Sequence, residues 1–388
     1  MMTPLSVVSN AVSPALFLHV EQEMQGEHIE RNPVIRSLLV ALIARQHVIL
    51  LGPPGTGKSR LARDLCSRLT GAFFEWQLTR LSTPEELFGP ISLQGLQQDR
   101  YRRIPQGKLP EADIAYLDET FKASSAILNT LLAAMNERVF FNDGQAVPMP
   151  LIMLIGASNE LPEDRGELGA LWDRFLVRQV VDYVQDPQAF AHMLHAANRP
   201  AMQTQLSLTD LQQAQSESEQ IDIEPVLPLL GQLRAQLAGQ GLIVSDRRWR
   251  QSLGLIQADA WLNGHATAAP EDVLILQHVL WESPDQRMMV AKQVMALISP
   301  YDQEAQDILD DARDAVTQLA NRPSDEDDQA KMMAALETSK VLKDAKKRLE
   351  QVIRKAQVEA GTADERAKTG LDELEQWGEN IMKNYLRV

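Results

Sequence analysis

Cysteine is almost absent from this chain of 388 residues, which contains only Cys66. A single cysteine cannot form an intramolecular disulfide, so a reducing compartment fits the sequence best. The first 30 residues contain no Lys or Arg and no long apolar run. We therefore expect no signal peptide and no membrane span, and we expect a cytoplasmic protein.

Positive charge is also scarce. The chain has 38 Lys and Arg against 53 Asp and Glu, which gives a net charge of -15. This balance opposes general affinity for nucleic acid, although it is compatible with a local basic patch. The seven histidines and the cysteine show no ligand spacing typical of structural zinc. A guanine-reading Asn-Lys-x-Asp motif is absent as well.

A complete phosphate-binding loop is present after the apolar run Val48–Leu51. Glycines let its backbone turn tightly and point N–H groups at phosphate oxygens. Lys58 is expected to reach the β- and γ-phosphates, and Ser59 to bind Mg²⁺. The nucleotide-binding residues that we predict are Gly52, Pro53, Pro54, Gly55, Thr56, Gly57, Lys58, Ser59 and Arg60.

Two carboxylates follow a second apolar run, Ile114–Leu117. Apolar residues that end in Asp118-Glu119 are typical of a Walker B motif, in which Asp118 holds Mg²⁺ and Glu119 activates the attacking water. Acids often cap strands, so this pattern is weak in isolation. The phosphate-binding loop about 60 residues upstream makes the catalytic interpretation specific.

A polar amide follows another apolar run, Leu151–Ile155. Strands and helices alternate from residue 34 to about 185, which predicts a parallel α/β sheet. Ligands collect at the carboxyl ends of such strands. We therefore predict that Asn159 hydrogen-bonds the γ-phosphate or the attacking water.

Taken together, the chain resembles the AAA+ ATPases of the MoxR family, and most of all their RavA-like branch. The resemblance covers roughly residues 30 to 300, and the ordered set of motifs is more specific than any one of them. The motifs are Gly52 to Ser59, Thr83-Pro84-Glu85-Glu86-Leu87-Phe88-Gly89-Pro90, Leu117-Asp118-Glu119, Asn129 to Arg138, Ala157-Ser158-Asn159-Glu160-Leu161-Pro162, Trp172-Asp173-Arg174-Phe175 and Ser245-Asp246-Arg247-Arg248-Trp249.

The resemblance implies roles for two arginines. Arg174 matches the arginine finger that projects into the site of the neighbouring subunit. Arg247 matches the sensor 2 arginine, which contacts the nucleotide within its own subunit. Because the family has Ser-Pro-Arg where this chain has Ser-Asp-Arg-Arg, either Arg247 or Arg248 could be that residue. A planar, permanently charged guanidinium suits the charge of a phosphoryl group in transfer.

The expected architecture has three parts: an α/β nucleotide-binding core (1–187), an α-helical lid (188–300) and a helical tail or bundle (301–388). Relatives carry a pore-lining hairpin in the region that corresponds to residues 85–110. A second hairpin is predicted around Asn142-Asp143-Gly144, a strong turn signal. In the tail, apolar residues recur near heptad spacing and predict a helical hairpin or a three-helix bundle, which could dock a partner or brace a ring. They are Leu342, Ala345, Leu349, Val352, Ala356, Leu371, Leu374, Ile381 and Tyr385.

The leading functional hypothesis is a ring-forming, Mg²⁺-dependent ATPase that remodels a protein partner. The resemblance implies ATP as the nucleotide, a homo-hexamer and a chaperone role toward a von Willebrand A domain protein. One alternative is a nucleic-acid motor or loader that uses the basic segment around Tyr101. Another is a scaffold whose assembly is gated by nucleotide. We do not expect nucleic acid as the partner, because the chain is acidic and no base-reading element is visible.

Overall fold

A five-stranded parallel sheet forms the centre of the computed structural model, which describes residues 13–161, 167–195, 204–298, 300–320, 322, 328–359 and 365–383. The strand order is β2-β3-β6-β1-β7. The strands are β1 (Val48–Leu51), β2 (Phe73–Gln77), β3 (Ile114–Asp118), β6 (Met153–Ser158) and β7 (Val177–Val180). All four residues of β1 are buried, as expected for a strand covered on both faces. The predicted parallel α/β class is confirmed.

The parallel register separates two edges of the sheet. In β1, Leu51 pairs with Ser158 of β6 and with Val180 of β7, so the three strands end at the same level. The segments that follow β1, β3 and β6 therefore gather at one edge. The segments that precede the strands lie at the opposite edge. Each candidate site residue lies at one of these two edges.

Helices and short 3-10 turns connect the strands, with some boundaries that differ from those predicted. The helices are α1 (Pro14–Glu27), α2 (Asn32–Ile43), α3 (Lys58–Ser67), α4 (Pro84–Phe88), α5 (Leu93–Leu96), α6 (Ser125–Asn136), α7 (Glu167–Arg174) and α8 (Pro187–His195). The 3-10 turns are Leu109–Glu111 and Thr120–Lys122. Helix α3 stops two residues before the predicted Leu69, and the strand expected over Leu151–Ile155 begins at Met153.

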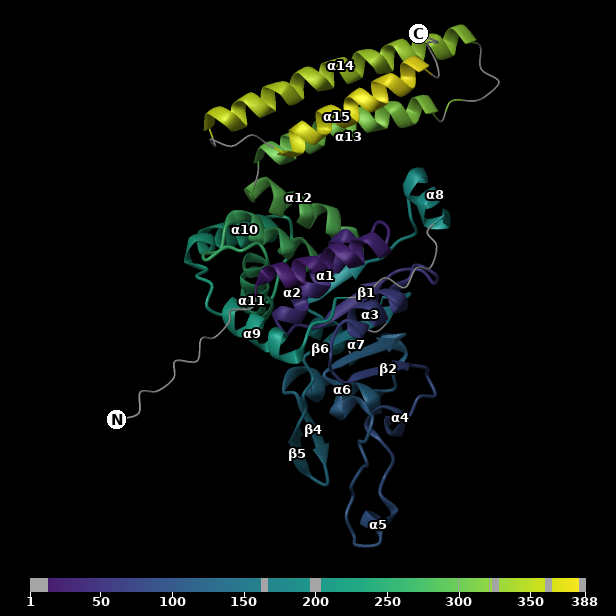
Figure 1. Ribbon diagram of the computed structural model, residues 1–388, viewed down its shortest axis with the longest axis vertical. Coiled ribbons are helices and arrows are strands. Elements are labelled where there is room, and N and C mark those ends of the chain that lie inside the picture. The colour runs from purple at the N-terminus through teal and green to yellow at the C-terminus, as the bar shows by residue number, and fades with distance from the viewer. Residues whose placement is uncertain are drawn as a thin grey trace. The chain divides into compact units, whose positions relative to one another are not determined.

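Two insertions project from the same end of this unit (Figure 1). One is the hairpin of β4 (Val139–Asn142) and β5 (Gln145–Pro148), whose turn has positive φ angles at Asp143 and Gly144. The predicted turn is confirmed. The other carries α5 and closes through one antiparallel bridge between Ile91 and Arg103.

Helices continue after β7. They are α9 (Leu208–Ser218), α10 (Leu227–Gly239), α11 (Asp246–Leu262) and α12 (Arg287–Ile298), with 3-10 segments at Glu224–Val226, Pro270–His278 and Pro284–Gln286. Helix α11 packs on α1, α2 and α9. The described residues divide into two compact units, which fall within 1–234 and 238–287 and within 235–237 and 288–388. No described helix combines the length and apolar composition that a membrane crossing requires.

The tail is a bundle of α13 (Pro300–Ala320), α14 (Asp328–Glu359) and α15 (Glu365–Ile381), which pack on one another. The five predicted heptad residues between Leu342 and Ala356 are all buried, as are Leu374 and Ile381. Leu371 packs against this core while partly exposed, whereas Tyr385 lies outside the described residues. The heptad pattern therefore predicted the bundle core correctly.

Candidate active site

The loop after β1 approaches the backbone that follows β7. Gly52, Gly55 and Gly57 have φ angles of 149°, 82° and 86°, in the region that favours glycine. A Cβ on Gly52 would lie 2.1 Å from the carbonyl oxygen of Val181, whereas one on Gly55 would meet nothing within 4 Å. The positive φ angles of these glycines and the close approach of Gly52 to Val181 therefore both constrain the loop.

We expect Gly52→Ala to weaken nucleotide binding and to destabilise the protein, because the loop must move away from Val181. The destabilisation should be about 1–3 kcal/mol, as for other overpacked sites. Thermal unfolding and titration with a fluorescent ATP analogue would measure both effects. Gly55→Ala is the matched control, since it adds backbone strain without a clash. Equal effects of the two substitutions would contradict the role of the contact.

Lys58 lies buried inside the loop. Its Nζ donates to the carbonyl oxygens of Gly52 (2.5 Å) and Pro53 (2.9 Å). It also donates to Oδ1 of Asn159, at 3.0 Å. Burial lowers the pKa of Lys58, and the nearby carboxylates Asp118 and Glu119 oppose that shift. The ammonium group is therefore positioned for an anion that would replace the carbonyl oxygens as its partner.

A hydroxyl and a carboxylate lie together where a divalent cation would bind. Ser59 Oγ is 3.5 Å from Oδ2 of Asp118 and accepts a hydrogen bond of 3.0 Å from the Tyr116 hydroxyl. Burial raises the pKa of Tyr116, so its phenol remains a donor. Hydroxyl and carboxylate oxygens are the ligands that Mg²⁺ prefers, and it usually takes only one or two from protein. Ser59 and Asp118 therefore fit a magnesium ion.

Glu119 has a left-handed backbone conformation, with φ of 52°. Its N–H donates to Oδ1 of Asp118 at 3.0 Å. Its carboxylate accepts from Nδ2 of Asn159 at 2.7 Å and pairs with Nζ of Lys122 at 3.2 Å. Lys58, Asn159 and Glu119 thus form one connected chain of side chains. The structure brings together residues that the sequence places on three separate strand ends.

Two residues at this edge gave no sequence signal. Arg31 Nη2 donates to the carbonyl oxygens of Asp182 (2.6 Å) and Thr56 (3.4 Å). The Tyr183 hydroxyl donates to the carbonyl oxygen of Pro54 at 3.1 Å. Both tie the loop to the segment after β7. By contrast, the side chain of the predicted residue Arg60 has no hydrogen bond or ion pair among the described residues, so its role stays a prediction.

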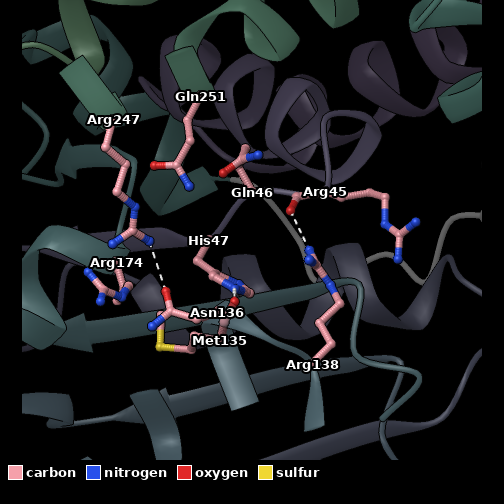
Figure 2. Close-up of a pocket in the computed structure, with 9 residues that line it drawn as sticks. All are labelled: Arg45, Gln46, His47, Met135, Asn136, Arg138, Arg174, Arg247 and Gln251. Atoms are coloured by element: carbon pink, nitrogen blue, oxygen red, sulfur yellow. Dashed lines mark hydrogen bonds between the residues drawn. The ribbon is translucent and has the colours of Figure 1, made fainter. Parts of the chain in front are cut away.

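The two predicted arginines lie at the other edge of the sheet, where β1 begins (Figure 2). Arg174 ends α7, and Arg247 lies in the first turn of α11. Arg247 donates to Oδ1 of Asn136 at 2.8 Å, and it is not near the phosphate-binding loop of its own chain. The structure does not bring Arg247 to that loop, and a contact with the nucleotide of its own subunit stays a prediction. The reason is the packing of α11 on α2, which directs its first turn to the strand starts.

Arg248 and Arg178 are fully buried. Arg248 Nη1 donates to the carbonyl oxygens of Leu176 (3.1 Å) and Val279 (2.9 Å). The Arg178 guanidinium lies 4.3 Å from the ring centroid of Trp172. Of the pair Arg247 and Arg248, only Arg247 can reach a ligand, since its side chain is 40% exposed.

Comparisons with known proteins agree with this geometry. Residues 16–221 match the model of the MoxR domain in the MoxR-vWA-beta-propeller ternary systems, and residues 225–294 match an AAA lid domain. An uncharacterized protein of Methanocaldococcus jannaschii is 37% identical over 76% of this chain and 76% of its own length. The chaperone MoxR1 of Mycobacterium tuberculosis is 28% identical over 40% of this chain and 41% of its own length.

The fold also has a solved counterpart. The crystal structure of a proposed ATPase from Cytophaga hutchinsonii superposes with a TM-score of 0.57 and covers 72% of this chain and 94% of that one. At 16% sequence identity, this similarity concerns the fold alone. Pro162 of the Ala157–Pro162 motif lies outside the described residues.

Proposed function

Because this chain belongs to the MoxR family of AAA+ ATPases, we propose that it hydrolyses ATP with Mg²⁺ and uses the energy to remodel a protein partner. The observation that carries the proposal is the chain formed by Lys58, Asn159 and Glu119. It puts a phosphate-binding ammonium next to a carboxylate able to activate water, with Ser59 and Asp118 beside them for Mg²⁺. An enzymatic phosphate-release assay with and without Mg²⁺ tests it directly.

A polypeptide fits the projecting insertions better than nucleic acid does. Arg100 pairs with Asp143 at 2.7 Å, and Arg103 pairs with Glu85 at 3.0 Å, so much of the basic charge is neutralised. The exposed apolar residues there favour contact with a protein chain. They are Leu93, Leu96, Tyr101, Ile104, Phe141 and Val147. The nucleic-acid motor is therefore not our proposal.

The partner that we propose is a von Willebrand A domain protein, in keeping with the systems for which the matched MoxR domain is named. A homo-hexameric ring, a cytoplasmic location and the division at residues 187 and 300 belong to the same proposal. Placement in the RavA-like branch rests on the motif resemblance alone and stays a prediction.

Nucleotide is expected to drive assembly, because ATP bound at a subunit boundary stabilises only the associated state. Light scattering with and without a non-hydrolysable ATP analogue should show a shift to a larger particle. Lys58→Ala is the control, since it should remove the shift by weakening nucleotide binding. A monomer that persists at high protein concentration with saturating nucleotide would contradict a ring.

A further inference from the structure

Helix α14 of the C-terminal bundle has a second patterned face besides the one that forms the bundle core. Helices α13 and α15 both pack on α14, and its buried residues form the core with them (Figure 1). Other residues recur every three or four positions, which places them along one face of the helix. This set, the outer row, consists of Met332, Leu336, Lys340, Lys343, Lys347, Glu350 and Arg354. No member of the outer row is buried, so the row points away from the core.

The cations of the outer row have no partners in the part of the chain that the structure describes. Their side chains are exposed and make no hydrogen bond or ion pair there; they are Lys340, Lys343, Lys347 and Arg354. By contrast, three other cations of α14 pair with α13 or α15 at 2.6, 3.7 and 3.3 Å. These pairs are Lys346–Glu375, Arg348–Asp311 and Lys355–Glu304.

The spacing of the unpaired cations does not help the helix itself. Lys343 and Lys347 are four residues apart, and like charges at this spacing destabilise an isolated helix. The chain as a whole has a net charge of -15, so an exposed row of unpaired cations runs against its overall charge. The outer row therefore offers positive charge to a negatively charged partner outside the bundle.

Apolar side chains and a cavity lie at the N-terminal end of the same helix. Met332, Met333 and Leu336 are 50%, 62% and 47% exposed. Exposed apolar residues grouped in this way are typical of a contact with another protein. A cavity of about 340 Å³ lies between α13 and α14 in this region, and its lining includes Ala334 and Val341. This end of the surface therefore suits apolar side chains of a partner.

A protein fits these features better than a membrane or a nucleic acid does. A helix that lies in a membrane interface inserts its apolar face into lipid, but the main apolar face of α14 is buried in the bundle. A nucleic acid would gain little from the exposed methionines, and it would be repelled by the exposed carboxylates Asp310 and Asp314 of α13. A protein segment supplies both carboxylates and apolar side chains.

We propose that the outer row binds an acidic helical segment of a partner protein, with apolar side chains at one end and carboxylates along the rest. From Met332 to Arg354 the row is about 33 Å long, at about 1.5 Å per residue, and so matches a partner helix of about 22 residues. Carboxylates of that segment pair with the four cations, and its apolar end covers Met332, Met333 and Leu336. This docking surface goes beyond the proposed ATPase activity and does not depend on it.

Binding of a synthetic helix to the full-length protein tests the proposal. The probe is a fluorescein-labelled helical peptide with leucines along one half of a face and glutamates along the other half. A peptide of the same composition in scrambled order is the reference. Fluorescence anisotropy should show that the patterned peptide binds at least about tenfold more tightly, and added salt should weaken its binding. Equal affinity for the two peptides, or no binding of either, would overturn the proposal.

Neutralising the outer row should weaken binding of the patterned peptide by at least about tenfold, the combined effect of three exposed ion pairs. The variant carries Lys340→Gln, Lys343→Gln and Lys347→Gln. The matched control removes the same charge from the paired cations of the same helix and should bind within about threefold of the parent; it carries Lys346→Gln, Arg348→Gln and Lys355→Gln. Equal losses in the two variants would show that only net charge matters and would overturn the proposal. Circular dichroism verifies that both variants keep their helix content.

Two further measurements define the chemistry of the partner. Met332→Gln, Met333→Gln and Leu336→Gln together should also weaken binding of the patterned peptide, by at least about fivefold, because they remove apolar contact area. Parental affinity in that variant would contradict the apolar contact. Tighter binding of a single-stranded oligonucleotide, or of vesicles of phosphatidylserine and phosphatidylcholine, would overturn the choice of a protein partner. An inactive parental protein that still binds the peptide would refute the ATPase function alone and would support the docking surface.

Discussion

Glu119→Gln is expected to stop ATP hydrolysis while Mg·ATP binding persists. The amide keeps the shape of the side chain and can still accept the hydrogen bond from Asn159, but it cannot take a proton from water. Loss of a general base lowers turnover by about 10²–10⁴-fold. Single-turnover hydrolysis and equilibrium titration with a fluorescent ATP analogue would measure the two properties separately.

Two further variants serve as controls for Glu119→Gln. Glu160→Gln changes an exposed carboxylate at the same edge of the sheet and should hydrolyse ATP normally. Lys58→Ala should weaken nucleotide binding instead, since its ammonium lies inside the loop. Parental turnover by the Glu119 variant at saturating Mg·ATP would show that another group activates the water.

Arg174→Ala is expected to lower the turnover of the assembled protein by at least about a hundredfold, a minimum set below the about 10³–10⁵-fold that arginine fingers supply. The nucleotide affinity of a single subunit should change little, because Arg174 lies at the edge opposite its own phosphate-binding loop. Steady-state ATP turnover is measured above the protein concentration at which subunits assemble. The nucleotide affinity of the single subunit is measured below that concentration.

Arg63→Ala is the control for Arg174→Ala, since Arg63 is 60% exposed and pairs only with Glu75 among the described residues. Unchanged turnover in the Arg174 variant would mean that the finger lies elsewhere. Arg178, the next arginine along the chain, could not replace it, because its side chain is fully buried against Trp172. Loss of nucleotide affinity in the monomer would make Arg174 a structural residue.

Much of the nucleotide site could be predicted because its parts are local. The loop from Gly52 to Ser59 is formed by consecutive residues whose glycines permit its positive φ angles. Asp118 is the last residue of β3 and Asn159 directly follows β6, and parallel strands end at one edge. The supporting contacts of Arg31 and Tyr116 could not be predicted, because each depends on side chains brought together from separate elements.

The sequence by itself determined the glycine-rich loop, the pair of carboxylates after Leu117, the α/β class and the helical tail. Each of these is encoded by short-range spacing, turn chemistry or apolar periodicity. Only the tertiary structure decided which arginine is accessible and which edge it faces. Arg247 and Arg248 are adjacent in the chain, yet α11 packs so that one is exposed and the other is buried. That difference arises from the contacts of α11 with α1, α2 and α9, which no local pattern in the sequence records.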